Sequence, residues 1–104
     1  MIKKEILRDA IIETVKTIFD TEIPVNIYEL GLIYEIKVDN DFNVHILMTL
    51  TSPNCPVAES LPTEVKEKVQ NIRGLNEVEV KVIFEPSWDK SMMSEEALLE
   101  LGFL

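Results

Sequence analysis

The residue best suited to chemistry in this sequence is Cys55, the only cysteine in a chain of 104 residues. It follows Ser52, Pro53 and Asn54, where an alternating apolar pattern ends and a helical pattern is about to begin. A thiol in a proline-flanked turn ahead of a helix is exposed to unpaired amide groups and to the positive end of the helix dipole. Both favour the thiolate, which binds metals and attacks electrophiles. We therefore expect a functional thiol rather than a small buried apolar residue.

Two carboxylates and two hydroxyls could act together with this thiol. Asp20 and Glu22 stand where the first predicted helix ends, and the connection that follows could bring them near the end of the sheet. Carboxylate oxygens and a thiolate form a donor set that suits zinc or iron. Thr51 and Ser52 add hydroxyl groups close to the cysteine. These ligands are too few for a closed metal site, and solvated surface carboxylates are the alternative interpretation.

The single histidine and a short group of aromatic and methionine residues are further candidates. His45 lies within a predicted strand, on its polar face, and strand residues at about 3.3 Å each separate it from the cysteine turn. We expect it to be a surface residue. Trp88, Met92 and Met93 form either a partner-binding patch or a hydrophobic lid over the sheet. The large area that an aromatic ring buries favours the lid.

Composition limits the class of protein. The length suits a single domain spanning residues 1–104. Nineteen acidic against ten basic side chains give a net charge of -9, which argues against nucleic acid or an anionic membrane as a partner. One cysteine makes no internal disulfide, and no signal peptide or membrane span is visible, so we expect a cytoplasmic protein.

Apolar spacing predicts the helices that must position these groups. Residues 5–19 and 58–72 carry apolar side chains three and four positions apart, as on one face of a helix. Ser94 has the character of an N-cap, and Gly102 follows the last turn, which predicts a short third helix between them. Pro62 either separates a first turn, Pro56 to Leu61, from the second helix or kinks that helix.

Alternating patterns predict three strands, over residues 34–38, 42–50 and 78–84. The connection over residues 20–31 is apolar enough to pack down and suits a single helical turn closed by Gly31. The order helix, strand, strand, helix, strand, helix predicts an α+β two-layer fold, with helices on one face of a three-stranded sheet. One helix joins the second and third strands, so these two should point the same way. The pattern leaves open which strand the third one pairs with.

Three segments spread over most of the chain carry a specific combination of motifs. They read DTEIPVNIYELGLIY over residues 20–34, MTLTSPNCP over 48–56, and PSW over 86–88, followed by Met93 and Ser94. Together they resemble the SufT-like and PaaD-like proteins of iron-sulfur cluster assembly, a family once catalogued as a domain of unknown function. No one segment alone would be specific enough.

The resemblance implies that Asp20, Glu22, Thr51 and Cys55 cluster as the functional site. The chain departs from the family where proline usually separates the two acidic residues and where the family usually reads Asp-Pro-Pro-Trp, since it has Thr21 at the first place and Glu-Pro-Ser-Trp at the second. Both changes could loosen loops, but neither removes a candidate ligand. PaaD-type members carry a cysteine-rich extension tied to an oxygenase complex. That extension is absent from this sequence, so a stand-alone SufT-like role fits better than that of an oxygenase accessory subunit.

Iron-sulfur clusters generally need four thiolate or equivalent ligands, and this chain offers one cysteine. We expect Cys55 to hold iron, sulfur or a cluster transiently and to share ligands with a second protomer, a partner protein or a small thiol. No cofactor would then be bound tightly by one chain, and a homodimer becomes possible. The resemblance implies carrier or scaffold proteins and client apoproteins as partners. A P-loop ATPase carrier is a further one, because some relatives are fused to such a domain. An adaptor role without metal is the alternative within the family.

Two other classes of function fit less well. A cysteine enzyme with Cys55 as nucleophile needs a nearby base, and His45 is poorly placed for that task. We therefore expect an assembly factor that is not an enzyme. Nucleic-acid binding is disfavoured by the negative charge and by the absence of a basic glycine loop.

Overall fold

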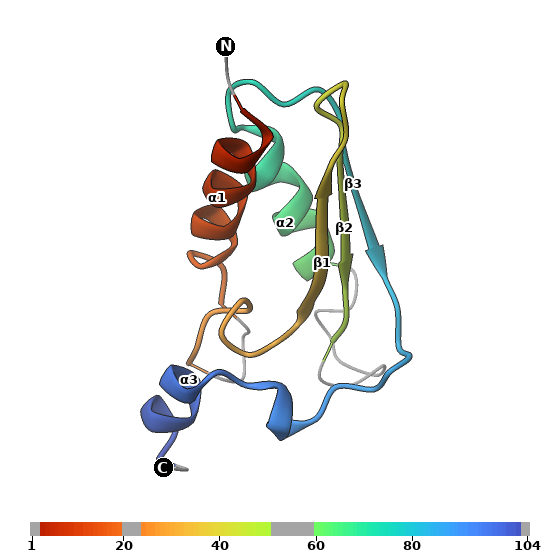
Figure 1. The fold of residues 1–104 in the computed structure, drawn as a ribbon. Helices are drawn as coiled ribbons and strands as arrows, with labels where there is room; N and C mark the ends of the chain where they lie inside the picture. Colours follow the sequence, from red (N-terminus) through yellow and green to blue (C-terminus); the bar gives the residue numbers. More distant parts are fainter. Residues whose placement is uncertain (1–2, 20–23, 51–59, 103–104) are drawn as a thin grey trace.

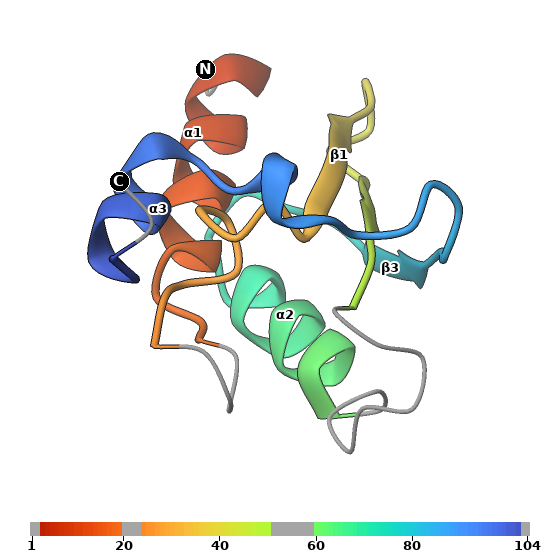
Figure 2. The ribbon, with the colours of Figure 1, turned by 90° about the horizontal axis from the view of Figure 1, so that it is seen from below.

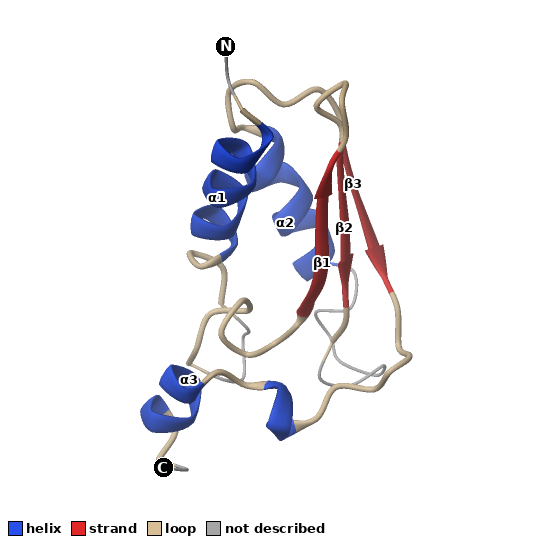
Figure 3. Cartoon of the chain, viewed as in Figure 1, coloured by secondary structure: helices blue, strands red, loops and turns tan. Residues whose placement is uncertain are grey.

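The computed structural model of the chain describes residues 3–19, 24–50 and 60–102, and these form two layers (Figure 1). The elements in chain order are α1 (Lys4–Val15), β1 (Ile33–Val38), β2 (Val44–Met48), α2 (Ser60–Gln70), β3 (Val78–Val82), a 3-10 turn (Lys90–Met92) and α3 (Glu95–Glu100). α1 and α2 cover one face of the sheet, while α3 lies below them (Figure 3). The predicted α+β fold and its element order are confirmed.

The sheet is mixed, with β2 in the centre. β1 and β2 pair antiparallel as a hairpin, whereas β2 and β3 pair parallel, with Val44 opposite Val78 and Met48 opposite Val82. The prediction that β2 and β3 point the same way is therefore confirmed, and the structure settles that they are neighbours. α2 makes the crossover that parallel neighbours require. Figure 2 shows α2 lying along the sheet on the same side as α1.

Apolar faces of the helices meet the inner face of the sheet in one core. The fully or nearly fully buried members from these elements are Leu7, Ile11, Val15, Ile36, Val44, Ile46, Met48, Leu61, Val65, Val69 and Val78. Burying each such side chain contributes roughly 1.5–3 kcal/mol, so this packing is what holds the two layers together. None of the helices in the three described ranges is long and apolar enough to cross a membrane.

Several predicted helices and strands extend beyond the ends that the structure shows. α1 ends at Val15, and the chain then turns so that Ile18 still reaches the core with no exposed surface. Phe42 belongs to the hairpin turn rather than to β2, because its φ of 62° is incompatible with a strand. Phe84 lies beyond the end of β3 and is 42% exposed, although the alternation placed it on the buried face.

Pro62 lies inside α2, two residues after Ser60. Ser60 and Leu61 both belong to this helix, so they do not form part of a separate turn. The rest of that predicted turn, residues 56–59, falls outside the described residues. α3 begins and ends as predicted: Ser94 Oγ accepts a hydrogen bond of 3.1 Å from the amide of Ala97, and Gly102 follows with a φ of 81°.

Candidate functional site

The residues on which the predicted metal or cluster site depends lie outside the described part of the chain. They are Asp20, Glu22, Thr51, Ser52, Asn54 and Cys55. The structure does describe the residues that flank both segments, namely Phe19 and Pro24 on one side and Leu50 and Ser60 on the other. The described part of the site is therefore the frame that holds these flanks.

The first part of the frame is a single helical turn in the connection between α1 and β1. Asn26 caps it, since its Oδ1 accepts a hydrogen bond of 2.9 Å from the amide of Glu29. The turn closes when the amides of Gly31 and Leu32 donate to the carbonyls of Tyr28 and Ile27, each at 3.1 Å. Gly31 has a φ of 83° in this closure, the conformation that glycine adopts most readily after a helical turn. The predicted turn closed by Gly31 is thus confirmed.

Two backbone hydrogen bonds fasten this turn to its neighbours. The amide of Ile27 donates to the carbonyl of Ile18 at 2.8 Å, which joins the turn to the end of α1. The amide of Thr49 donates to the carbonyl of Leu32 at 2.8 Å, which joins it to the end of β2. Phe19 and Leu50, the next residues along the chain, are therefore anchored to one connection. Convergence of the ligands that follow them remains a prediction.

The second part of the frame is the segment between β3 and α3, which crosses below the sheet (Figure 1). The indole Nε1 of Trp88 donates to the carbonyl of Leu30 at 2.7 Å, and the amide of Ser94 donates to the carbonyl of Glu29 at 2.9 Å. The hydroxyl of Tyr34 donates to the carbonyl of Pro86 at 2.7 Å. This segment, residues 84–94, is hereafter called the strap.

The structure describes all three residues of the predicted aromatic and methionine group, which lie on the strap. Met93 is buried in the core, with 8% of its surface exposed. Trp88 packs against the same core and is half-buried, as is Met92, whose sulfur lies 3.6 Å from the hydroxyl of Tyr34. This packing corresponds to the lid that the sequence favours. Partner binding by these residues stays a prediction.

Thr49 is a buried polar residue whose position the alternating pattern did not reveal. The pattern placed it on the polar face of the second strand, but β2 ends at Met48 and Thr49 has no exposed surface. Its Oγ1 is the one buried side-chain oxygen without a hydrogen-bond partner among the residues the structure describes. Such an atom costs roughly 1–3 kcal/mol. The signal available in the sequence was its place in an apolar run, between Leu47-Met48 and Leu50.

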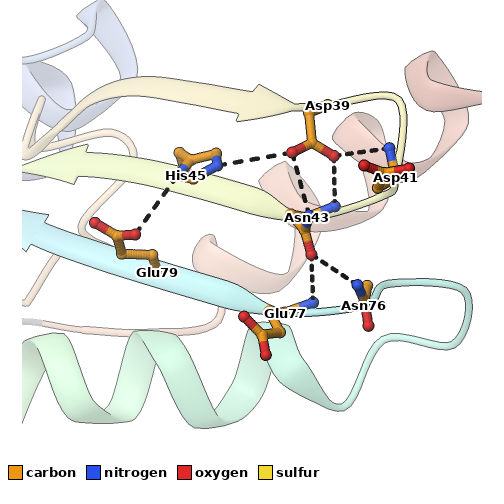
Figure 4. Close-up of polar contacts among 7 residues, drawn as sticks. All are labelled: Asp39, Asp41, Asn43, His45, Asn76, Glu77 and Glu79. Carbon is orange, nitrogen blue, oxygen red and sulfur yellow. Dashed lines mark hydrogen bonds and ion pairs between the residues drawn. The ribbon is translucent and has the colours of Figure 1, made fainter.

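A polar network lies at the opposite end of β2, around the hairpin turn (Figure 4). Asp39 Oδ1 accepts hydrogen bonds from the amides of Asn43 at 2.9 Å and Asp41 at 2.8 Å. Asn43 Oδ1 in turn accepts from Asn76 Nδ2 at 2.9 Å and from the amide of Glu77 at 3.2 Å. The amide of Asn43 is the main reason why the pKa of Asp39 is lowered. The network ties the hairpin to the start of β3.

His45 belongs to this polar end of the sheet. Its Nε2 lies 3.9 Å from Asp39 Oδ2 and its Nδ1 lies 3.7 Å from Glu79 Oε2, with 52% of the side chain exposed. The prediction of a surface histidine is confirmed. Within residues 3–19, 24–50 and 60–102, no three His, Cys, Asp or Glu side chains are grouped so that they could hold a metal ion. The described residues therefore supply a frame and not a ligand set.

Comparison with known proteins shows which family this chain resembles. Residues 8–82 match the family of iron-sulfur cluster assembly proteins. An Fe-S protein maturation auxiliary factor from Porphyromonas gingivalis is 51% identical over 94 residues, which are 90% of each chain. The Fe-S protein maturation auxiliary factor SufT from Staphylococcus aureus is 35% identical over 85 residues, covering 82% of this chain and 97% of the relative.

The fold agrees with that assignment. The crystal structure of a domain of unknown function from Bacillus anthracis superposes with a TM-score of 0.88 at 35% sequence identity, over 96% of this chain and 95% of the other. Sequence and fold therefore agree over nearly the whole length, including the turn and the strap. This chain belongs to the family of iron-sulfur cluster assembly proteins, as a SufT-like member.

Proposed function

We propose that this protein is an auxiliary factor of iron-sulfur cluster assembly or maturation that carries iron, sulfur or a cluster transiently on Cys55. The observation that carries the general role is the family match over residues 8–82, together with relatives named as Fe-S protein maturation auxiliary factors. The finer step, carriage on the thiol, is argued from the chemistry of the residues. We propose that it acts as an assembly factor and not as an enzyme.

The proposed ligand set is the thiolate of Cys55 with the carboxylates of Asp20 and Glu22. Sulfur and oxygen donors together suit iron, and a set this small leaves coordination positions open for ligands from another molecule. Thr51, Ser52 and Asn54 are proposed as supporting groups that hydrogen-bond the thiolate or the cargo. The anchoring of Phe19 and Leu50 to one connection supports this proposal, because both ligand segments leave from the same frame.

Open coordination makes the proposed mechanism one of ligand exchange. Cys55 holds the cargo while thiolates of a carrier or scaffold protein leave, and thiolates of a client apoprotein then replace it. A second protomer or a small thiol could complete the coordination between these events, and a P-loop ATPase carrier could be the donor. The whole chain, residues 1–104, is proposed to act as one unit in this exchange. Low ligand count favours transfer over storage.

Anaerobic reconstitution with ferrous iron and sulfide tests the carrier role. Wild type is expected to bind iron and sulfide in proportion to protein, and Cys55→Ser is expected to lose most of that binding. His45→Gln is the matched control, because it removes an exposed potential ligand at the other end of β2 and should bind as wild type does. Equal binding by wild type and Cys55→Ser would overturn the carrier role and leave an adaptor that docks carriers and clients without metal.

A further inference from the structure

A groove of about 220 Å³ lies between the helical turn of the α1–β1 connection and α3. Phe19 and Pro24 form an exposed apolar part of its wall, and Phe19 has 52% of its surface accessible. The small buried residue Ala97 contributes from α3. Figures 1 and 2 show α3 beside this connection in both views. The groove is large enough for one long side chain of another molecule.

Three carboxylates line the same groove. Glu29 comes from the turn, and Glu96 and Glu100 come from consecutive turns of α3, four residues apart on one face. In the ranges that the structure describes, no Lys, Arg or His forms an ion pair with any of them. Like charges at this helical spacing repel each other. The groove therefore holds uncompensated negative charge next to an exposed aromatic ring.

We propose that this groove docks an arginine side chain that a protein partner presents on a segment with apolar neighbours. Arginine fits because its planar guanidinium pairs with carboxylates in fixed geometry and also stacks on aromatic rings. Its aliphatic stem covers apolar surface such as that of Phe19 and Pro24. Among the residues that the structure describes, these three carboxylates do not form a group that could hold a metal ion, and an organic cation suits a wall that also carries an aromatic ring.

The groove lies partly outside the residues that the family model matches. α3 lies after residue 82, where the family match ends, so one wall of the groove stands outside the matched region. The groove also shares the turn that anchors the flanks of the proposed ligand segments. The identification of the arginine-bearing partner as an iron-sulfur carrier or client rests on the proposed function. The binding of arginine in the groove does not depend on that function.

A peptide titration followed by NMR of backbone amides tests the proposal. The probe is the acetylated and amidated peptide Gly-Leu-Arg-Leu-Gly, and the comparison peptide has citrulline, a neutral isostere, in place of arginine. Saturable shifts are expected at the amides of Asn26, Glu29 and Ala97 with the arginine peptide. The citrulline peptide should bind at least fivefold more weakly. Raising the salt concentration should weaken binding of the arginine peptide, because salt screens charges that lie in an open groove.

Variants of α3 provide matched controls. Glu96→Gln and Glu100→Gln should each weaken binding of the arginine peptide roughly two- to fivefold, as expected for the loss of one exposed ion pair. Glu95→Gln removes the same charge from the first turn of α3 without lining the groove, so it should bind as wild type does. Equal binding of both peptides, shifts that map elsewhere, or equal weakening by Glu95→Gln would overturn the proposal. Cys55→Ser should leave peptide binding unchanged, so failure of this test and failure of iron carriage are separable.

Discussion

The indole of Trp88 donates a hydrogen bond of 2.7 Å to the carbonyl of Leu30, a residue 58 positions earlier in the chain. This bond joins the strap to the helical turn from which the first ligand segment departs. It also explains why a large aromatic residue with a polar edge stands here, since phenylalanine could cover the core but could not donate.

Trp88→Phe is therefore expected to destabilise the protein by about 1–3 kcal/mol, because a carbonyl loses its donor while most of the apolar cover remains. Chemical denaturation followed by circular dichroism measures the change, since the only tryptophan is lost as a fluorescent probe. Trp88→Leu should cost more, because it removes packing as well. An unchanged denaturation midpoint for Trp88→Phe would show that solvent replaces the indole without loss.

Gly31 and Gly102 form a matched pair for separating steric overlap from backbone strain. Both have positive φ, 83° and 81°. A Cβ on Gly31 would lie 2.3 Å from the carbonyl oxygen of Met92, whereas a Cβ on Gly102 would meet nothing within 4 Å. Gly102→Ala should cost roughly 1–2 kcal/mol from the left-handed conformation alone. Gly31→Ala should cost clearly more, since the strap must also move.

Thermal and denaturant unfolding of the two alanine variants checks this difference. NMR shifts of the strap amides in Gly31→Ala give a second readout, and Gly102→Ala should leave those amides unmoved. Equal destabilisation of the two variants would mean that the strap yields to the added methyl group at no cost. The strap would then be a loosely held cover rather than part of the frame.

Thr49→Val replaces a buried hydroxyl by a methyl group of similar size. Because Oγ1 has no partner among the described residues, the substitution should be neutral or stabilising by up to about 1 kcal/mol. Thr49→Ser keeps the hydroxyl and removes a methyl group, so it should cost about 1 kcal/mol. The free energy of unfolding measures both effects. Marked destabilisation by Thr49→Val would show that the hydroxyl is satisfied in solution.

The lowered pKa of Asp39 predicts a pH-dependent contribution to stability. The main cause is the hydrogen bond from the amide of Asn43, which favours the charged carboxylate in the folded state. Since the folded pKa lies below the ordinary value of 3.8, the contribution is present above that value and is lost as the pH falls through the folded pKa. Wild type should exceed Asp39→Asn in stability at pH 6, and the gap should narrow below about pH 4.

Unfolding by urea at a series of pH values measures that gap. His45→Gln is the informative comparison, because the charge of His45 is the last and smallest cause of the lowered pKa of Asp39. Its pH profile should therefore stay close to that of wild type. A gap between wild type and Asp39→Asn that is constant from pH 6 to pH 3 would contradict the prediction.

Local signals were enough to predict the parts of the fold that local interactions create. Ser94 and Gly102 predict the two ends of α3, because capping and helix closure depend on a few adjacent residues. Gly31 revealed the helical turn for the same reason. Strand pairing was different: nothing near Val78 in the sequence shows that Val44 is its neighbour, because that choice depends on how α2 packs.

The burial of individual side chains could likewise be predicted only where it depends on local interactions. The alternating pattern continued past the ends of the strands, so it misplaced Thr49 and Phe84, whose burial depends on where the chain leaves the sheet. The groove could not be predicted from the sequence. Glu29 and Glu96 line one groove only because the strap brings α3 back to the first connection. The residues proposed for iron carriage were found from motif and resemblance, and the frame that anchors their flanks came from the structure.

The bond from the amide of Ser94 to the carbonyl of Glu29 has a consequence for synthesis on the ribosome. The chain is made from its N-terminus onward, and a domain generally folds as a unit. The first connection and the segment that contains Cys55 are made before the strap that fastens this connection. A nascent chain that has only reached Cys55 therefore lacks the closed frame. Release of residues 84–94 from the ribosome is the earliest point at which the complete frame can form.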